Sequence, residues 1–359
     1  MNRITSTVLL RLALIGIIIL AFTAGFAFAA GWLSPDRLSP ADIVDSLQIN
    51  SGVHPGFRRA HAKGLCIEGT FQANGNGAAL SKAQVFMPGE VPVIGRFSTG
   101  GGQPYAPDGR LVFHAIALSL TQADGEKWRM ALDDTPIFVV ATPLAFRDLQ
   151  LATAPDPATG KPDPARSADF LAHHPETRAF MDWIRDAPLP SSFANGTYYS
   201  INSFRFTNAA GETRHVRWSL VPETPFEALD KNTFANLPPD FLFEDVVRRL
   251  RQGPLRWHMM LTVAQPGDPV DDATKPWPAD RPQVDVGTLT INRASAEENG
   301  PCRNITFDPL ILPSGISPSD DPLLPARSGV YAVSLTRRDG EPVDPSAASK
   351  NPEIRRGAP

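Results

Sequence analysis

Cysteine is scarce in this chain, because its 359 residues include only Cys66 and Cys302. At most one disulfide bridge can therefore form within it. In an oxidising compartment these two cysteines can close one long loop, and the alternative is that both are buried as small apolar side chains that never meet. No spacing of cysteine and histidine matches a zinc site.

A surplus of positive charge is also missing. The formal net charge is −4 and the isoelectric point is near 6.0, so the chain offers nucleic acid no general electrostatic attraction. We therefore exclude nucleic acid as a partner. The sequence has no internal repeat and no clear interdomain linker, and its 36 prolines against 27 glycines favour long irregular connections over a helical bundle.

Charged residues are absent from residues 12–32, which Arg3 and Arg11 precede. This run has the length of about 20 residues that a helix needs to span a bilayer core, while residues 27–29 (Ala-Phe-Ala) also have the form of a signal-peptide cleavage site. Residues 1–33 are thus predicted to be a membrane anchor or a signal segment. The positive charge before the run places the rest of the chain outside the cytoplasm, as a periplasmic domain that is anchored or is released after cleavage near Ala29.

Residues 34–340 are predicted to form one domain of mixed α and β structure, followed by a polar, loose C-terminal tail at residues 341–359. Short segments rich in β-branched residues predict strands, and apolar residues at helical spacing predict a few helices. The predicted strands lie at residues 64–71, 84–87, 93–97, 112–120, 127–132, 137–140, 197–207, 215–221, 258–264 and 286–292, and the predicted helices lie within residues 35–56, 170–185 and 241–253.

Four short motifs stand out in this domain. The segment Arg58–Gly64 reads Arg-Arg-Ala-His-Ala-Lys-Gly, and the segment Phe307–Tyr331 begins with Phe-Asp-Pro and ends with Arg-Ser-Gly-Val-Tyr. Between them, Gly95–Thr99 reads Gly-Arg-Phe-Ser-Thr and Asp133–Phe138 reads Asp-Asp-Thr-Pro-Ile-Phe. In this order the four segments resemble the haem catalases, whose corresponding motifs are His-Ala-Lys-Gly, Arg-Phe-Ser, Asn-Asn-Thr-Pro-x-Phe and Arg-x-x-x-Tyr.

The chain lacks the long N-terminal arm and the C-terminal helical domain of large catalases and adds an export segment, so it is most similar to the small catalase-related peroxidases. The resemblance implies a catalase-like antiparallel β-barrel core with surrounding helices and long loops, in the α+β class. It also implies haem b with ferric iron as the cofactor, buried between the barrel and a proximal helix.

The resemblance assigns Tyr331 as the proximal ligand of the iron. A free phenol has a pKa near about 10, so a nearby cation helps to keep a tyrosinate ligand ionised. Arg327 lies four residues earlier and shares a face with Tyr331 if this stretch is helical. Arg327 is therefore expected to supply that positive charge.

On the distal side, the resemblance assigns His61 as the acid/base. A neutral imidazole takes one proton from peroxide and returns it to the departing oxygen. Ser98, or alternatively Thr99, is expected to hydrogen-bond the other ring nitrogen and fix the ring. Phe138 and Phe146 match aromatic positions that line the distal pocket, and both also fit an ordinary apolar core.

Arginines are expected where the haem carries its propionate groups, because a guanidinium fork pairs well with a carboxylate. The family pattern assigns this role to Arg58, Arg96 and Arg338. For the last position the neighbouring Arg337 is an alternative.

Two positions depart from the catalase pattern. Asp133 aligns with an asparagine that donates hydrogen bonds to peroxide, whereas a carboxylate only accepts them unless burial raises its pKa and keeps it protonated. Ala60 replaces a bulkier β-branched residue above the iron, so the distal pocket is expected to admit larger molecules. Both departures favour peroxidase over catalase activity.

We therefore predict a haem-dependent peroxidase that reduces hydrogen peroxide or an organic hydroperoxide with electrons from an external donor. The alternatives are catalase-type disproportionation or hydroperoxide rearrangement on the same haem core, and a non-catalytic haem-binding or peroxide-sensing protein. The expected partners are the peroxide, the electron donor and, through the N-terminal segment, a membrane.

Overall fold

The computed structural model describes residues 6–29, 38–110, 113–342 and 344–357. It divides into two compact units, Met1–Ser39 and Pro40–Pro359, and the second unit holds every predicted site residue.

Helix α1 (Ser6–Ala29) is the helix of the first unit. Its segment Thr7–Phe28 has a mean hydropathy of 2.4, so by length and composition it can cross a membrane. A signal sequence has the same character, so the helix leaves both predicted fates of the N-terminal segment open. The ends of that predicted segment, residues 1–5 and 30–33, lie outside the described residues.

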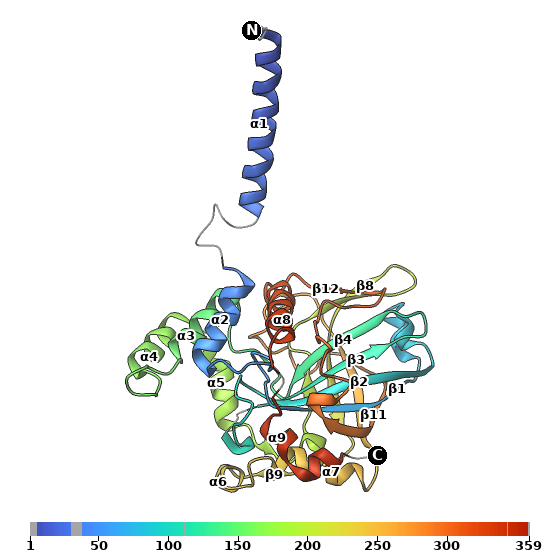
Figure 1. The fold of residues 1–359 in the computed structure, drawn as a ribbon. Coiled ribbons are helices and arrows are strands. Elements are labelled where there is room, and N and C mark those ends of the chain that lie inside the picture. Colours follow the sequence, from blue (N-terminus) through green and yellow to red (C-terminus); the bar gives the residue numbers. More distant parts are fainter. Residues whose placement is uncertain (1–5, 30–37, 111–112, 343, 358–359) are drawn as a thin grey trace. The chain divides into compact units, whose positions relative to one another are not determined.

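Eight strands of the second unit close into an antiparallel β-barrel (Figure 1). Around the barrel the order is β10, β11, β1, β2, β3, β4, β6 and β8, and the pairing of β8 with β10 completes the ring. This is the barrel that the resemblance implied. The barrel strands are β1 (Gly64–Ala73), β2 (Gly89–Thr99), β3 (His114–Thr121), β4 (Lys127–Asp133), β6 (Tyr198–Tyr199), β8 (Thr213–Pro222), β10 (Leu255–Val263) and β11 (Gln283–Ala296).

Alternate side chains of the barrel strands point inward, as the two-residue period of a strand requires. On β4, for example, Trp128, Met130 and Leu132 are buried, while the residues between them are only partly buried. The inward side chains form one packed core, in which the rings of Trp128 and Trp218 lie 5.0 Å apart. Because the interior of the barrel is filled, a ligand has to bind against its outer surface.

Helices and short strands cover the outside of the barrel, and Figure 1 shows α3, α4 and α5 projecting from it together. Helix α2 packs against both α3 and α8, and the Asn50 side chain fastens it to α3 through a hydrogen bond of 2.9 Å to the Gln150 carbonyl. These elements are α2 (Pro40–Ser51), α3 (Pro143–Ala152), α4 (Pro164–His173), β5 (Leu189–Pro190), α5 (Thr177–Asp186), β7 (Phe204–Thr207), β9 (Ala228–Leu229), α6 (Lys231–Ala235), α7 (Phe241–Leu250), β12 (Ile316–Pro318), α8 (Leu323–Asp339), α9 (Ala347–Lys350) and α10 (Pro352–Arg356).

Two segments predicted as strands take another form. Residues 84–87 lie largely in a short 3₁₀ helix, and the Val85 N–H donates to the side chain of Gln122 at 2.5 Å instead of to a strand. Residues 137–140 follow an irregular path, and the Phe138 N–H donates to a carbonyl far along the chain. Both predictions were wrong because a short apolar run is also buried outside sheets.

The helices around the barrel differ from prediction at several places. The single helix predicted over residues 170–185 is interrupted after His173, because Pro175 cannot continue a helical hydrogen-bond ladder. Helix α3 was not predicted, although Thr142 caps its first turn and Pro143 opens it.

The C-terminal tail is packed against the barrel unit and differs from the loose segment predicted after residue 340. Helices α9 and α10 place Ala348 and Ile354, both fully buried, in the main core. The two cysteines, whose pairing the sequence left open, form a disulfide between β1 and the segment after β11, with Cα atoms 5.4 Å apart.

Candidate active site

One cavity of about 500 Å³ lies between the outer surface of the barrel and α8. Its walls come from β2, β3 and β4, from the helices α2, α3 and α5, and from α8, and most of the lining side chains are apolar, as is usual for a cofactor site. All ten predicted site residues line it: Arg58, His61, Arg96, Ser98, Asp133, Phe138, Phe146, Arg327, Tyr331 and Arg338.

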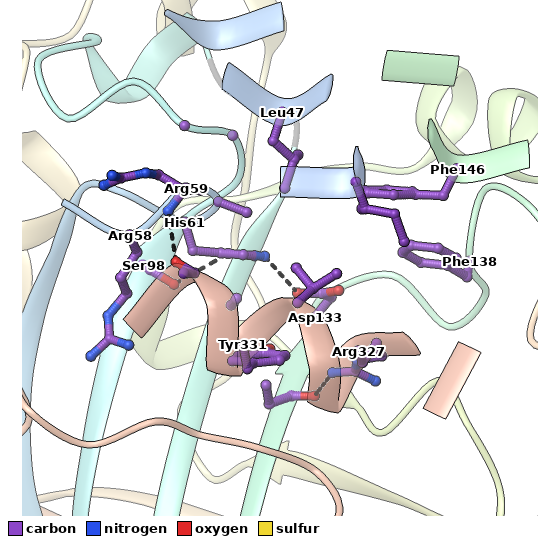
Figure 2. A pocket seen from close by; sticks show the side chains of 18 of the residues that line it. Leu47, Arg58, Arg59, His61, Ser98, Asp133, Phe138, Phe146, Arg327 and Tyr331 are labelled. Atoms are coloured by element: carbon purple, nitrogen blue, oxygen red, sulfur yellow. Dashed lines mark hydrogen bonds and ion pairs between the residues drawn. The ribbon is translucent and has the colours of Figure 1, made fainter. Parts of the chain in front are cut away.

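His61 lies just before β1 with a backbone φ of 54°, in the left-handed region that non-glycine residues rarely adopt. The Oγ of Ser98 is 3.3 Å from His61 Nδ1, and Oδ1 of Asp133 is 3.9 Å from Nε2 (Figure 2). The ring of Phe113 meets the imidazole edge-on at 5.7 Å between centroids. Ser98, not the alternative Thr99, therefore contacts the ring and holds it with Nε2 toward Asp133.

Burial determines the protonation states of His61 and Asp133. Burial, followed by the positive charge of Arg96 and two further cavity arginines, lowers the pKa of His61 to about 3. Burial also raises the pKa of Asp133 to about 7, a shift that Arg327 opposes and Asp134 increases. At neutral pH His61 is thus an uncharged base, and Asp133 is divided between carboxylic acid and carboxylate.

A second His–Asp pair lies behind Asp133 and outside the cavity lining. Asp134 accepts the backbone N–H of His114 at 2.9 Å, and its Oδ2 lies 3.2 Å from His114 Nδ1. The His114 side chain is buried, with its ring edge-on to Phe193. Asp134 therefore acts on the cavity through its charge, by raising the pKa of Asp133, and not by contact with a ligand.

Tyr331 and Arg327 lie one helical turn apart on α8, as their spacing predicted. Figure 2 shows the ring of Tyr331 below that of His61, with the cavity between the two segments that carry them. Arg327 donates to the side chain of Asn202, which in turn donates to Asp321 at 2.7 Å. The Tyr331 phenol makes no hydrogen bond to another described residue.

The arginines expected at the propionate groups gather at one end of the cavity around Glu297. Arg58 and Arg96 contact its carboxylate at 3.2 and 2.8 Å. Arg338 donates to the Arg303 carbonyl at 2.8 Å through Nη1. Its Nη2 and the Nε of Arg96 are buried and have no hydrogen-bond partner in the described part of the chain, so both can donate to a bound anion.

Arg338, and not the alternative Arg337, is the cavity residue. Arg337 points the other way and pairs with Asp45 on α2 at 2.6 Å. Burial, followed by the charge of Arg58, lowers the pKa of Arg338 to about 9. Arg58 itself turns its guanidinium away from His61 and Tyr331 (Figure 2), so it stands at the edge of the cavity.

The remaining walls are apolar. Phe138 and Phe146 stack with centroids 5.7 Å apart and, with Ala60 and Leu47, line the cavity on the side of α2 and α3. Such walls exclude water from a ligand between them.

Comparison with known proteins identifies the family. The model of the family described as Catalase matches residues 43–344 of this chain, which include all ten predicted site residues. The chain belongs to the catalase family.

Within the catalase family, the chain is similar over most of its length to two proteins named as catalase-related peroxidases. It is 37% identical to a catalase-related peroxidase of Synechococcus elongatus, over 92% of this chain and 96% of that protein. It is 34% identical to a catalase-related peroxidase of Mycolicibacterium paratuberculosis, over 84% of this chain and 96% of that protein.

Solved catalases share the fold and extend beyond this chain. A fungal catalase matches with a TM-score of 0.71 and 22% identity, over 80% of this chain and 60% of that structure. The chain therefore shares the catalase fold and spans about three fifths of that structure.

The catalase family implies haem iron, and the residues of the cavity fit that group. A phenol without a hydrogen-bond partner is a possible iron ligand. Buried guanidinium donors of Arg96 and Arg338 suit the propionate groups, and the apolar walls suit the porphyrin.

Four residues around the site were missed from the sequence: Phe113, His114, Asn202 and Glu297. A histidine within a strand that is otherwise apolar was a signal for His114. No local sequence pattern indicated Asn202 or Glu297, because the side-chain partners of each lie more than 100 positions away in the sequence. The hydrogen bond between Asn202 and Arg327 is an example.

Proposed function

We propose that this chain is a haem peroxidase that reduces hydrogen peroxide or an organic hydroperoxide with electrons from an external donor, and that its haem is haem b. The observation that carries the proposal is the placement of His61 and Tyr331 in one cavity, in a chain similar to catalase-related peroxidases over almost its whole length. Oxidation of a reducing dye that depends on both haem and peroxide tests it. Absence of that reaction in haem-loaded protein would contradict it.

The proposed roles follow from the contacts. When bound, haem supplies the iron at which the O–O bond of the peroxide is broken. Uncharged His61 takes a proton from the incoming peroxide at Nε2 and returns it to the departing oxygen, while Ser98 holds Nδ1. Tyr331 would hold the iron through its phenol oxygen, and Arg327, one turn earlier on α8, would place a positive charge near it.

Asp133 supports peroxidase over catalase activity. As a carboxylate it cannot donate a hydrogen bond to a second peroxide, and it sits 3.9 Å from the nitrogen that moves the proton. Asp133→Asn restores a permanent donor. At about pH 8, where Asp133 is mostly carboxylate, we expect oxygen release from hydrogen peroxide to rise on the order of tenfold, the effect of about 1.4 kcal/mol, which is roughly one hydrogen bond. An oxygen electrode measures this rate.

Asp134→Asn is the comparison variant, because it removes the neighbouring carboxylate, which raises the pKa of Asp133, without placing an amide donor in the cavity. It should give no rise in oxygen release. Equal rates in wild type and Asp133→Asn would show that the carboxylate does not suppress disproportionation.

Residual oxygen release should depend on pH through Asp133. Because the pKa of Asp133 is raised to about 7, the acid form donates a hydrogen bond below that pH and the carboxylate form does not above it. Oxygen release per haem should therefore fall as the pH rises through about 7, and Asp133→Asn should abolish this step. His61 stays neutral over this range, since its pKa lies near 3. A flat profile in the wild type would contradict the assignment.

We also propose that α1 anchors the haem domain to a membrane from the periplasmic side. The proposal is supported by the apolar segment Thr7–Phe28 and by the Cys66–Cys302 disulfide, which belongs in an oxidising compartment. Protein extracted from the membrane fraction should keep its N-terminus on sequencing. An N-terminus just after Ala29 in soluble protein would indicate cleavage instead.

A further inference from the structure

The cavity arginines depend on one segment of the chain, residues 297–307, which we name the clamp segment. Arg58 donates through Nη2 to the carbonyls of Cys302, Arg303 and Ile305 at 3.1, 3.2 and 3.0 Å. The carboxylate of Glu297 adds ion pairs to Arg58 and Arg96, and the Arg303 carbonyl accepts from Arg338. Every arginine assigned to the propionate groups is thus positioned by this segment.

Little regular structure holds the clamp segment itself. Apart from a 3₁₀ turn at Glu297–Asn299, its residues form turns and irregular backbone. Its first residue directly follows barrel strand β11, and farther along it is bonded to β1 by the disulfide between Cys302 and Cys66, which are 236 positions apart and buried with Phe307. Cys66 is paired in register with Arg96 across β1 and β2, so the bridge ends beside one of the arginines.

The clamp segment packs closely around the bridge. The backbone N–H of Cys302 points at the Cys66 sulfur at 3.2 Å. A Cβ on Gly300 would lie 2.6 Å from the same sulfur, so only glycine allows the segment to approach β1 this closely.

The positive charges of the cavity arginines explain why the clamp segment has to be fixed in place. The positive charges of Arg58, Arg96 and Arg303 act on Arg338, and the carboxylate of Glu297 pairs with Arg58 and Arg96. Burial disfavours the charge of Glu297, but Arg96 and Arg58 outweigh this and lower its pKa to about 2, so it stays ionised. A segment free to move would let the guanidinium groups separate and turn to solvent.

We infer that the Cys66–Cys302 disulfide is a positioning element for the cofactor: it fixes the clamp segment and, through it, the arginines that hold the haem carboxylates. The inference rests on the proposed haem function. It predicts that loss of the bridge accelerates haem loss far more than an equal loss of folding stability does.

The test measures transfer of haem from the full-length protein in detergent to excess apomyoglobin, followed by absorption. Removal of the partners of a metal or cofactor ligand typically costs about 10- to 100-fold in affinity. Cys66→Ser/Cys302→Ser should therefore release haem at least about tenfold faster than wild type. Leu261→Ala, in the barrel interior and outside the cavity lining, is the control for stability and should stay within about twofold.

A second comparison separates positioning from general destabilisation. Arg338→Met should accelerate haem loss in the wild type and in the Leu261→Ala background by the same factor. In the double-serine background its effect should largely disappear, because Arg338 is already out of place. If the double-serine chain does not fold, Gly300→Ala, which displaces the clamp segment against Cys66, takes its place in both comparisons.

Three results are decisive. A wild-type chain without a Soret band overturns the proposed haem function and this inference with it. If the wild-type chain binds haem but the disulfide variant releases haem within about twofold of the wild-type rate, only the inference about the disulfide is overturned. If Arg338→Met accelerates haem loss by the same factor in the double-serine background as in the wild type, the inference is also overturned.

Discussion

Replacement of His61 by alanine is expected to lower the rate of peroxide-dependent dye oxidation by about 10²- to 10⁴-fold, the usual contribution of a positioned acid/base. The imidazole is uncharged at neutral pH, and its Nε2 faces Asp133 at the cavity. No other described side chain that lines the cavity combines a neutral base with this position. Haem should remain bound, because His61 is not assigned to hold it. Stopped-flow measurement of dye oxidation per haem gives the rate.

A matched control is available for this variant. His258 is a surface histidine on β10, well outside the cavity lining, and His258→Ala should leave the rate unchanged. If His61→Ala oxidises the dye at the wild-type rate, His61 has no part in the proton transfer and the proposed mechanism fails.

Replacement of Tyr331 by phenylalanine should have the second large effect, on the iron itself. The substitution keeps the ring on α8 and removes only the phenol oxygen, which has no hydrogen-bond partner within the described chain. Because even the partners of metal ligands are worth about 10- to 100-fold in affinity, loss of the ligand should accelerate haem transfer to apomyoglobin by more than about 100-fold. The ferric absorption spectrum should change in the same experiment.

Tyr105→Phe is the control, because Tyr105 is 43% exposed and lies outside the cavity lining. It should preserve both the spectrum and the rate of haem transfer. A Tyr331→Phe protein with the wild-type ferric spectrum would mean that another group binds the iron.

The sequence predicted much of the site because its motifs are local. His61, Ser98, Asp133 and Tyr331 each sit in a short motif, and the order of those motifs was enough to assign the family. The spacing of Arg327 and Tyr331 was also enough to place both on one face of a helix, as α8 confirms. Their roles stay predictions until the variants are measured.

The parts that escaped prediction depend on contacts between distant segments. Glu297 meets Arg58 and Arg96 only after β11 has paired with β1, and no local pattern encodes that meeting. The pairing of Cys66 with Cys302 stayed open for the same reason, since 236 positions separate them. Residues 341–359 have a polar composition, which did not indicate that Ala348 and Ile354 join the core.

Some local predictions failed because the periodicity of a short run is ambiguous. Residues 84–87 and 137–140 are mostly apolar, yet the backbone N–H groups of Val85 and Phe138 bond outside any sheet. The second of these segments carries Phe138, so its irregular path is also what brings that ring to the cavity.

Haem is proposed to bind at Tyr331 and, when bound, to reduce peroxide with the help of His61. One measurement can test both roles. The most direct test is the absorption spectrum of the full-length ferric protein, purified in detergent after expression with added haem, before and after addition of hydrogen peroxide and a reducing dye. We expect a Soret band and peroxide-dependent oxidation of the dye. A folded protein that carries no Soret band would contradict both roles.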